Sequence, residues 1–238
     1  MLLKDVVLSS LPAPYYHFEY DSDDRIVVVS FASGLTNYNV TYAGGRIAEL
    51  QNNILVNHDR LVYVYDDAGR VALVKEVDET GATFALVVLT YDGQKLTGLE
   101  RDRRVVGGLI IDKTMSMTYD ANGNLRDLTE HRPAIAGLQD DETSVVHFEQ
   151  YDSGTNVDGF GLIHNDFFDH LVLLPGVQLQ KGNPRRETRT GDGLNYVVDY
   201  AYTYDDQNRP LSKIGALTIT NGTDAGRQIQ ISSAFSYY

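Results

Sequence analysis

The segment YDDAGRVALV, from Tyr65 to Val74, contains the pattern that decides the fold of this 238-residue chain. A tyrosine-aspartate pair is followed by turn-forming residues, a basic residue and a run that is rich in apolar side chains. Five further segments follow this design with small departures, so the chain contains six copies of one unit. The other copies are YDSDDRIVVV from Tyr20, YAGGRIAEL from Tyr42, YDGQKLTGL from Tyr91, YDANGNLRDL from Tyr119 and YDDQNRPLSKI from Tyr204.

The spacing of the copies indicates a hairpin for each one. Successive tyrosines of the first five copies lie 22, 23, 26 and 28 residues apart, a length that accommodates two strands and two connections. The chain also contains 16 Tyr and 8 Phe among many Val, Ile and Thr residues, which favour strands. From Tyr196 to Tyr204 the tyrosines recur at every second or fourth position, as they do along one face of a strand.

The turn residues have a physical role in this interpretation. The aspartate accepts hydrogen bonds from the amides of the turn, and a Gly or Asn tolerates the positive φ that follows. The basic residue lies at the mouth of the hairpin and pairs with the aspartate. The structural turn residues predicted in this way are Asp66, Gly69 and Arg70, then Asp120 and Gly123, and finally Asp205, Asn208 and Arg209.

The apolar residues that follow each turn do not alternate simply. They occupy the first and fourth places after the basic position, as in Leu96 and Leu99 or in Leu211 and Ile214. In a regular strand this spacing points to opposite faces. Either a β-bulge shifts the phase, or both faces of the sheet are partly covered.

Composition excludes several classes of function. The net charge of -13 argues against sequence-independent binding of nucleic acid or of anionic lipid. The absence of cysteine excludes disulfides and thiolate metal sites. No cofactor is expected, since no complete phosphate-binding, dinucleotide or zinc-protease motif is found. No apolar run is long enough for a transmembrane helix.

The repeats resemble the YD repeats of the Rhs family, whose pattern is close to Y-D-x-x-G-R-L. Together with YDSGTNVDGFGL from Tyr151, KGNPRRET from Lys181 and the closing AFSYY, they are most similar to short secreted or lipid-anchored proteins of Bacteroidetes-type bacteria. That resemblance covers about Tyr20 to Tyr238. It implies a porin-like fold and a secreted, periplasmic or outer-membrane-attached location, for a family of unknown function.

Two features bear on that location. The sequence has no lipobox cysteine, and Met1 to Lys4 lack the order of residues that marks a secretory signal. Either the protein is cytosolic, or the signal segment is absent from this chain.

We therefore predict one all-β domain, an antiparallel meander of hairpins that forms a strongly curved or barrel-like sheet. Repeat hairpins extend over about residues 6–151, an irregular insertion over 152–193 and closing strands over 194–238. A short helix is predicted inside the insertion, where Asp166 caps a turn that carries Phe167, Phe168, Leu171 and Leu174.

Three functional interpretations are open. We favour a non-catalytic binding module for a glycan, peptide or protein, with Tyr196, Tyr200 and Tyr202 as the ligand-binding residues, although core packing also explains these side chains. The second is a hydrolase with acid/base residues near His164 and Asp166; the candidate metal ligands are His164, Asp166 and His170. The third is a structural shell or scaffold of the YD-repeat type. The sequence leaves the oligomeric state open.

Overall fold

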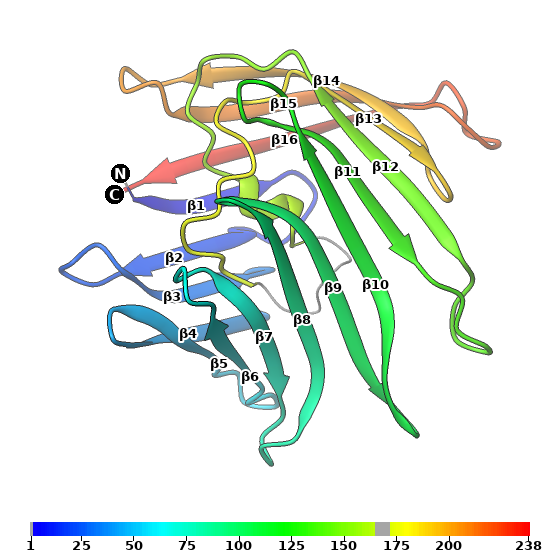
Figure 1. Cartoon of the computed structure of the whole chain (residues 1–238). Coiled ribbons are helices and arrows are strands. Elements are labelled where there is room, and N and C mark those ends of the chain that lie inside the picture. Colours follow the sequence, from blue (N-terminus) through cyan, green and yellow to red (C-terminus); the bar gives the residue numbers. More distant parts are fainter. Residues whose placement is uncertain (1, 165–171) are drawn as a thin grey trace.

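The computed structural model describes residues 2–164 and 172–238, and in these residues sixteen strands form a closed antiparallel barrel (Figure 1). Each strand pairs with the next along the chain, and β1 (Leu3–Leu8) pairs with β16 (Gln228–Tyr237) to close the sheet. The predicted antiparallel, barrel-like meander is thus confirmed. The other strands are β2 (Tyr16–Tyr20), β3 (Ile26–Phe31), β4 (Thr36–Ala43), β5 (Arg46–Asn52), β6 (Arg60–Tyr65), β7 (Val71–Val77), β8 (Thr83–Asp92), β9 (Lys95–Val105), β10 (Gly108–Tyr119), β11 (Leu125–Arg132), β12 (Glu142–Glu149), β13 (Arg186–Gly191), β14 (Tyr196–Tyr204) and β15 (Pro210–Ile219).

The connections between strands divide between the two ends of the barrel. The six repeat turns join β2 to β3, β4 to β5, β6 to β7, β8 to β9, β10 to β11 and β14 to β15. Because successive strands are antiparallel, these turns all lie at one end, which we call the repeat end. The connection between β12 and β13 also lies there. The other connections lie at the opposite end, which we call the open end.

The structure places the turn residues as follows. The backbone N–H of Arg70 donates to the Asp66 carboxylate at 2.9 Å, the Arg70 guanidinium pairs with it at 2.7 Å, and Gly69 has a φ of 82°. These hydrogen bonds from Arg70 lower the pKa of Asp66 below its ordinary value. Equivalent places are held by Asp120 and Gly123 in one turn, and by Asp205, Asn208 and Arg209 in another.

A β-bulge at each repeat explains the irregular spacing of apolar residues. Tyr119 pairs with Leu125, whereas Thr118 pairs with Asp127, so one residue of β11 has no partner in the ladder. The bulge lets both Leu125 and Leu128 face the interior, where both are buried. The register shifts at the tyrosine of every copy, namely Tyr20, Tyr42, Tyr65, Tyr91, Tyr119 and Tyr204.

Leu211 and Ile214 do not occupy the first and fourth places after the basic residue. Leu211 and Ile214 are 43% and 52% exposed. Pro210, rather than Leu211, follows Arg209 directly and is buried. The inward positions of this copy are therefore Pro210 and Lys213, one residue earlier than the sequence analysis placed them.

Neighbouring hairpins are joined by the repeat tyrosines. The hydroxyl of Tyr91 donates to the backbone carbonyl of Val71 in the preceding hairpin at 2.9 Å, and the Arg70 guanidinium lies over the Tyr91 ring, 4.7 Å from its centre. Arg70 thus contacts both its own turn aspartate and the next tyrosine. The same hydrogen bond joins Tyr20 to Leu3, Tyr42 to Ile26, Tyr65 to Ile47, Tyr119 to Leu96, Tyr151 to Leu125 and Tyr237 to Pro210.

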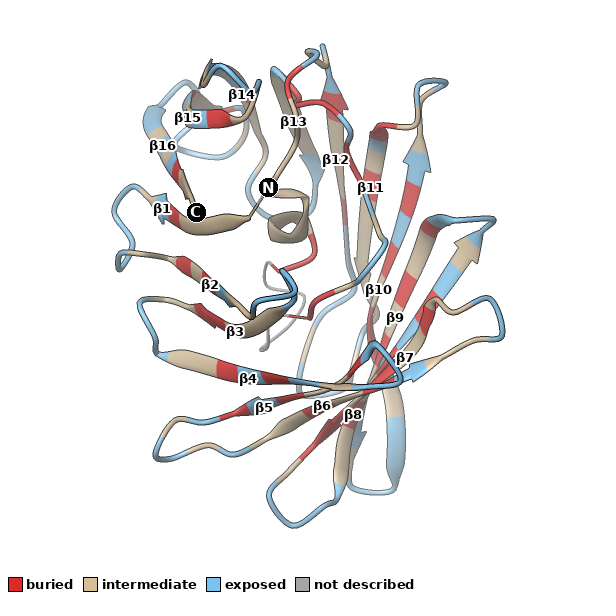
Figure 2. Ribbon diagram, turned by 90° about the vertical axis from the view of Figure 1, so that its left-hand side faces the viewer, coloured by how far each residue is buried: buried red, intermediate tan, exposed pale blue. Residues whose placement is uncertain are grey.

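The described parts of the segment between β12 and β13, residues 150–164 and 172–185, fold into the barrel (Figure 1). Its residues Ile163, Val172 and Leu179 belong to the same buried core as the inward side chains of the strands (Figure 2). The predicted insertion 152–193 extended too far, because β13 lies within it. The sequence of β13, RETRTG, contains no apolar residue and so gave no alternation.

A short 3₁₀ helix, η1 (Gly159–Leu162), lies in the insertion. Of the residues predicted to form a short helix, Asp166, Phe167, Phe168 and Leu171 lie outside the described residues, and Leu174 is described and is not helical. Within the described part of the chain, no helix has the length and apolar character needed to cross a membrane.

The insertion begins and ends at a repeat turn that has been split. Asp152 accepts hydrogen bonds from the backbone N–H groups of Gly154 at 2.9 Å and Asn183 at 3.2 Å, and its own N–H donates to the Asn183 carbonyl at 3.1 Å. In the copy at Tyr65, Asp66 makes the corresponding bonds with Arg70, four residues further on. Tyr151 and Asp152 therefore open a repeat turn that Asn183 completes.

The outer face of the barrel carries ion pairs along its strands. Leu128 and Phe148 are buried, so the adjacent Asp127 and His147 point outward, where they pair at 2.5 Å. Although partial burial opposes the shift, hydrogen bonds from His147, Thr118 and Arg126 lower the pKa of Asp127 to about 2. Glu49 with Arg60 and Arg186 with Asp199 form further pairs.

We expect the free energy of unfolding to fall above about pH 10. Burial raises the pKa of Tyr20, Tyr91 and Tyr119 from 10.0 to about 12. The unfolded chain loses these protons first, so this stabilisation is complete below pH 10 and is lost as the pH rises through about 12. Urea denaturation at a series of pH values measures the effect, and a constant free energy of unfolding across this range would contradict it.

The split turn predicts a difference between two glycines of the insertion. A Cβ at Gly182 would lie 2.2 Å from the backbone oxygen of Asp152, whereas a Cβ at Gly161 would meet no atom within 4 Å. Gly182→Ala should therefore destabilise the protein by about 1 to 3 kcal/mol, and Gly161→Ala should change its stability little. Thermal denaturation of the two variants compares them; equal midpoints would show that the close approach is not maintained.

Candidate functional site

The three tyrosines predicted to bind ligand lie on the inner face of β14. The hydroxyls of Tyr196 and Tyr200 donate to the two carboxylate oxygens of Glu187, at 2.6 and 3.0 Å, and the hydroxyl of Tyr202 donates to the backbone carbonyl of Pro184 at 3.0 Å. Burial, followed by nearby acidic groups, raises the pKa of all three tyrosines. Since the hydroxyls are engaged inside the protein, only the rings are free to contact a ligand.

These tyrosines do not form one continuous platform. Tyr196 lines a cavity at the open end, and Tyr200 lines a different cavity together with Lys213. The Tyr202 ring stacks on the ring of Tyr204, with their centres 6.1 Å apart. Of the three, Tyr196 is the one that contacts the larger cavity.

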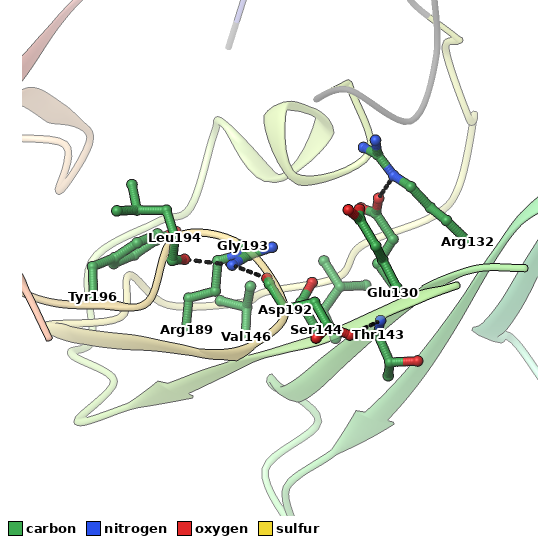
Figure 3. A pocket seen from close by; sticks show the side chains of 12 residues that line it. Glu130, Arg132, Thr143, Ser144, Val146, Arg189, Asp192, Gly193, Leu194 and Tyr196 are labelled. Atoms are coloured by element: carbon green, nitrogen blue, oxygen red, sulfur yellow. Dashed lines mark hydrogen bonds and ion pairs between the residues drawn. The ribbon is translucent and has the colours of Figure 1, made fainter. Parts of the chain in front are cut away.

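The cavity beside Tyr196 has a volume of about 460 Å³ and lies at the open end, between β11, β12, β13 and β14 (Figure 3). We call it the mouth cavity. Its lining combines apolar, aromatic and charged side chains. The lining residues are Leu128, Glu130, Arg132, Glu142, Thr143, Ser144, Val146, Arg189, Asp192, Gly193, Leu194 and Tyr196.

Two arginines are held at opposite sides of the mouth cavity (Figure 3). The Arg132 Nε pairs with Glu130 at 2.8 Å. Arg189 donates from one terminal nitrogen to the backbone carbonyls of Asp192, at 2.9 Å, and of Leu194. These bonds fix the guanidinium of Arg189 beside Tyr196 and leave its other N–H groups for a ligand.

Glu142 supplies a carboxylate to the same cavity. Its side chain is exposed and makes no hydrogen bond or ion pair with any residue in 2–164 or 172–238. The buried Ser144 also lies in the lining, and the described lining residues include no histidine, lysine or cysteine. The mouth cavity therefore offers hydrogen-bonding groups and a ring rather than a nucleophile next to a nitrogen base.

The candidate metal and acid/base residues are only partly described. His164 is buried, its Nδ1 lies 3.0 Å from the Tyr16 hydroxyl, and its ring contacts Phe31. Asp166 and His170 lie outside the described residues. Within the described ranges, no three His, Asp or Glu side chains are grouped to hold a metal. The metal site and the hydrolase site remain predictions.

Sequence reasoning missed the residues that surround Tyr196. Glu130, Glu142 and Arg189 come from three strands, and Arg189 belongs to the strand that was taken for an irregular segment. Strand alternation and the antiparallel register of β11, β12 and β13 bring them to one end. A correct boundary for β13 would have been the signal needed to find the site.

No protein family and no curated protein matches the sequence. Two solved structures resemble the barrel. A porin-like protein from Bacteroides uniformis ATCC 8492 has a TM-score of 0.62 and 12% identity, over 94% of this chain and 89% of that one. A porin-like protein from Bacteroides vulgatus ATCC 8482 has a TM-score of 0.62 and 14% identity, over 100% and 99% of the two chains.

At this level of identity the likeness concerns the fold alone. It confirms the porin-like architecture that the sequence resemblance implied. The relationship to YD-repeat proteins remains a prediction, because no family matches. The chain thus has a porin-like β-barrel fold, with a cavity of mixed polarity at the open end.

Proposed function

We propose that the protein is a non-catalytic binding protein that recognises a glycan in the mouth cavity. The observation that carries this proposal is the placement of the Tyr196 ring beside Arg189 in a cavity that also contains the unpaired Glu142 carboxylate. A sugar ring has an apolar face that stacks on an aromatic ring and hydroxyls that bind carboxylate and guanidinium groups. The volume of about 460 Å³ falls in the range of small-ligand sites.

A peptide or a protein is the other class of ligand, and the fold favours it less. Many peptides bind by adding a strand to the free edge of a sheet. The barrel is closed between β1 and β16, so it has no such edge. The closed sheet also argues against a scaffold that joins partners through strand edges. A shell that encloses cargo needs an empty interior, whereas the insertion 150–185 supplies core residues here.

We propose a secreted, periplasmic or outer-membrane-attached location for this binding protein. The porin-like fold and the resemblance to secreted proteins of Bacteroidetes-type bacteria support it. Outward pairs such as Asp127 with His147 suit contact with water better than contact with lipid chains.

A glycan array tests the proposed function. The wild type should bind a subset of the glycans, Tyr196→Ala should bind them about tenfold more weakly because it removes the stacking ring, and Tyr196→Phe should retain most of the binding. Glu142→Gln should weaken binding without altering the fold, since Glu142 is exposed.

The same array decides against the proposal in two cases. If no glycan binds, or if Tyr196→Ala binds as strongly as Tyr196→Phe, the mouth cavity is not a glycan site. Binding of a peptide library that depends on Tyr196 would assign the cavity to the alternative class of ligand.

A further inference from the structure

Lys213 is an inward-facing lysine that lies at the boundary between the barrel wall and the insertion. Its Nζ lies 4.3 Å from the centre of the Tyr200 ring and 3.8 Å from a carboxylate oxygen of Asp158. The side chain is 20% exposed, and none of the residues 2–164 and 172–238 accepts a hydrogen bond from it. An ammonium carries three donors, and leaving them unused in a largely buried place is costly.

Two cavities meet at this ammonium. One, of about 240 Å³, is lined by Leu8, Leu11, Ile231 and Tyr200 as well as by Lys213, the only charged residue among the described residues of this lining. The other, of about 300 Å³, extends between the wall and the insertion and also has Lys213 and Ser233 in its lining. We call the smaller one the lysine cavity. A single cation in an otherwise apolar and hydroxyl-bearing pocket favours a ligand with one anionic group and an apolar body.

We propose that the lysine cavity binds a medium-chain carboxylate, such as a fatty acid. Its carboxylate would accept hydrogen bonds from the Lys213 ammonium and from the Ser233 hydroxyl, and its chain would lie against Leu8, Leu11 and Ile231. This site is separate from the mouth cavity and does not depend on the proposed glycan function.

The carboxylates nearby determine how the site responds to substitution. Asp158, in the insertion, pairs with Lys213 at the long distance of 3.8 Å and so competes with a ligand carboxylate. Glu187 lines the cavity of about 300 Å³ between the wall and the insertion. Its two carboxylate oxygens already accept hydrogen bonds from the hydroxyls of Tyr196 and Tyr200. Removal of the charge of Asp158 should therefore strengthen the binding of a carboxylate.

Isothermal titration with octanoate tests the proposal, with 1-octanol as the uncharged probe of equal chain length. Lys213→Met should bind octanoate about tenfold more weakly than the wild type, because it removes a charge-assisted hydrogen bond. Asp158→Asn should bind it several-fold more tightly. Lys75→Met, on the outer face of β7, is the matched control and should bind as the wild type does.

The outcomes are distinct. If the wild type does not bind octanoate, or if Lys213→Met binds it as tightly as the wild type, the proposal is overturned. Octanol should bind equally to the wild type and to Lys213→Met. If Lys213→Met loses the binding of octanol together with that of octanoate, the substitution has collapsed the cavity. If Lys213→Met does not fold or its cavity collapses, the Asp158→Asn variant provides the test instead. An affinity of Asp158→Asn for octanoate equal to that of the wild type would then reject the site.

Discussion

The barrel depends on the hydrogen bond that five of the six repeat tyrosines, all except Tyr204, donate to the backbone of the preceding part of the sheet. A single hairpin is only marginally stable in water. The hydroxyl of Tyr91 on Val71, worth about 0.5 to 1.5 kcal/mol, and the Arg70 guanidinium over the ring, worth about 0.5 to 1 kcal/mol, join one hairpin to the next. Because the bulge occurs at the same tyrosine, one residue sets both the register and the contact between neighbours. These interactions all lie at the repeat end, which leaves the open end free to form cavities.

The insertion begins where this series of contacts changes. In the copy at Tyr119, Asn124 replaces the basic residue, and its side-chain oxygen accepts the backbone N–H groups of Lys181 and Gly182, at 2.9 and 3.2 Å. The next tyrosine, Tyr151, receives a hydrogen bond from Gln180 instead of a cation over its ring. The insertion therefore occupies the place of a missing cation and returns to complete a repeat turn.

The sequence predicted those features that depend on neighbouring residues. Turn chemistry such as Asp66 with Gly69 is local, so the hairpins and the barrel-like meander were predictable. The sequence leaves the bulge as one of two alternatives, because a register shift depends on pairing with another strand. The boundary of β13 was missed because its side chains carry no apolar alternation, and Lys213 was missed because the inward places of this copy, the first and fourth after Arg209, hold Pro210 and Lys213 rather than two large apolar residues. The mouth cavity requires three strands in register, which no single segment of sequence reveals.

The distribution of polarity in this barrel follows from its size. Eight strands enclose a space that their own side chains fill, whereas sixteen strands enclose a much wider one. Porins leave that space to water and turn apolar residues toward lipid. Here the buried apolar side chains of the strands line the interior, together with buried ion pairs such as Arg101 with Asp112, and the outer face carries ion pairs such as Asp127 with His147. The interior of such a wide barrel still needs further apolar material. The insertion supplies it through residues such as Ile163 and Leu179.

An irregular segment packed against a regular wall leaves gaps, and the contact between Asp158 and Lys213 lies at such a gap. Besides the mouth cavity, which strands and their connections line, a binding site inside this fold is therefore expected along the boundary between the insertion and the wall.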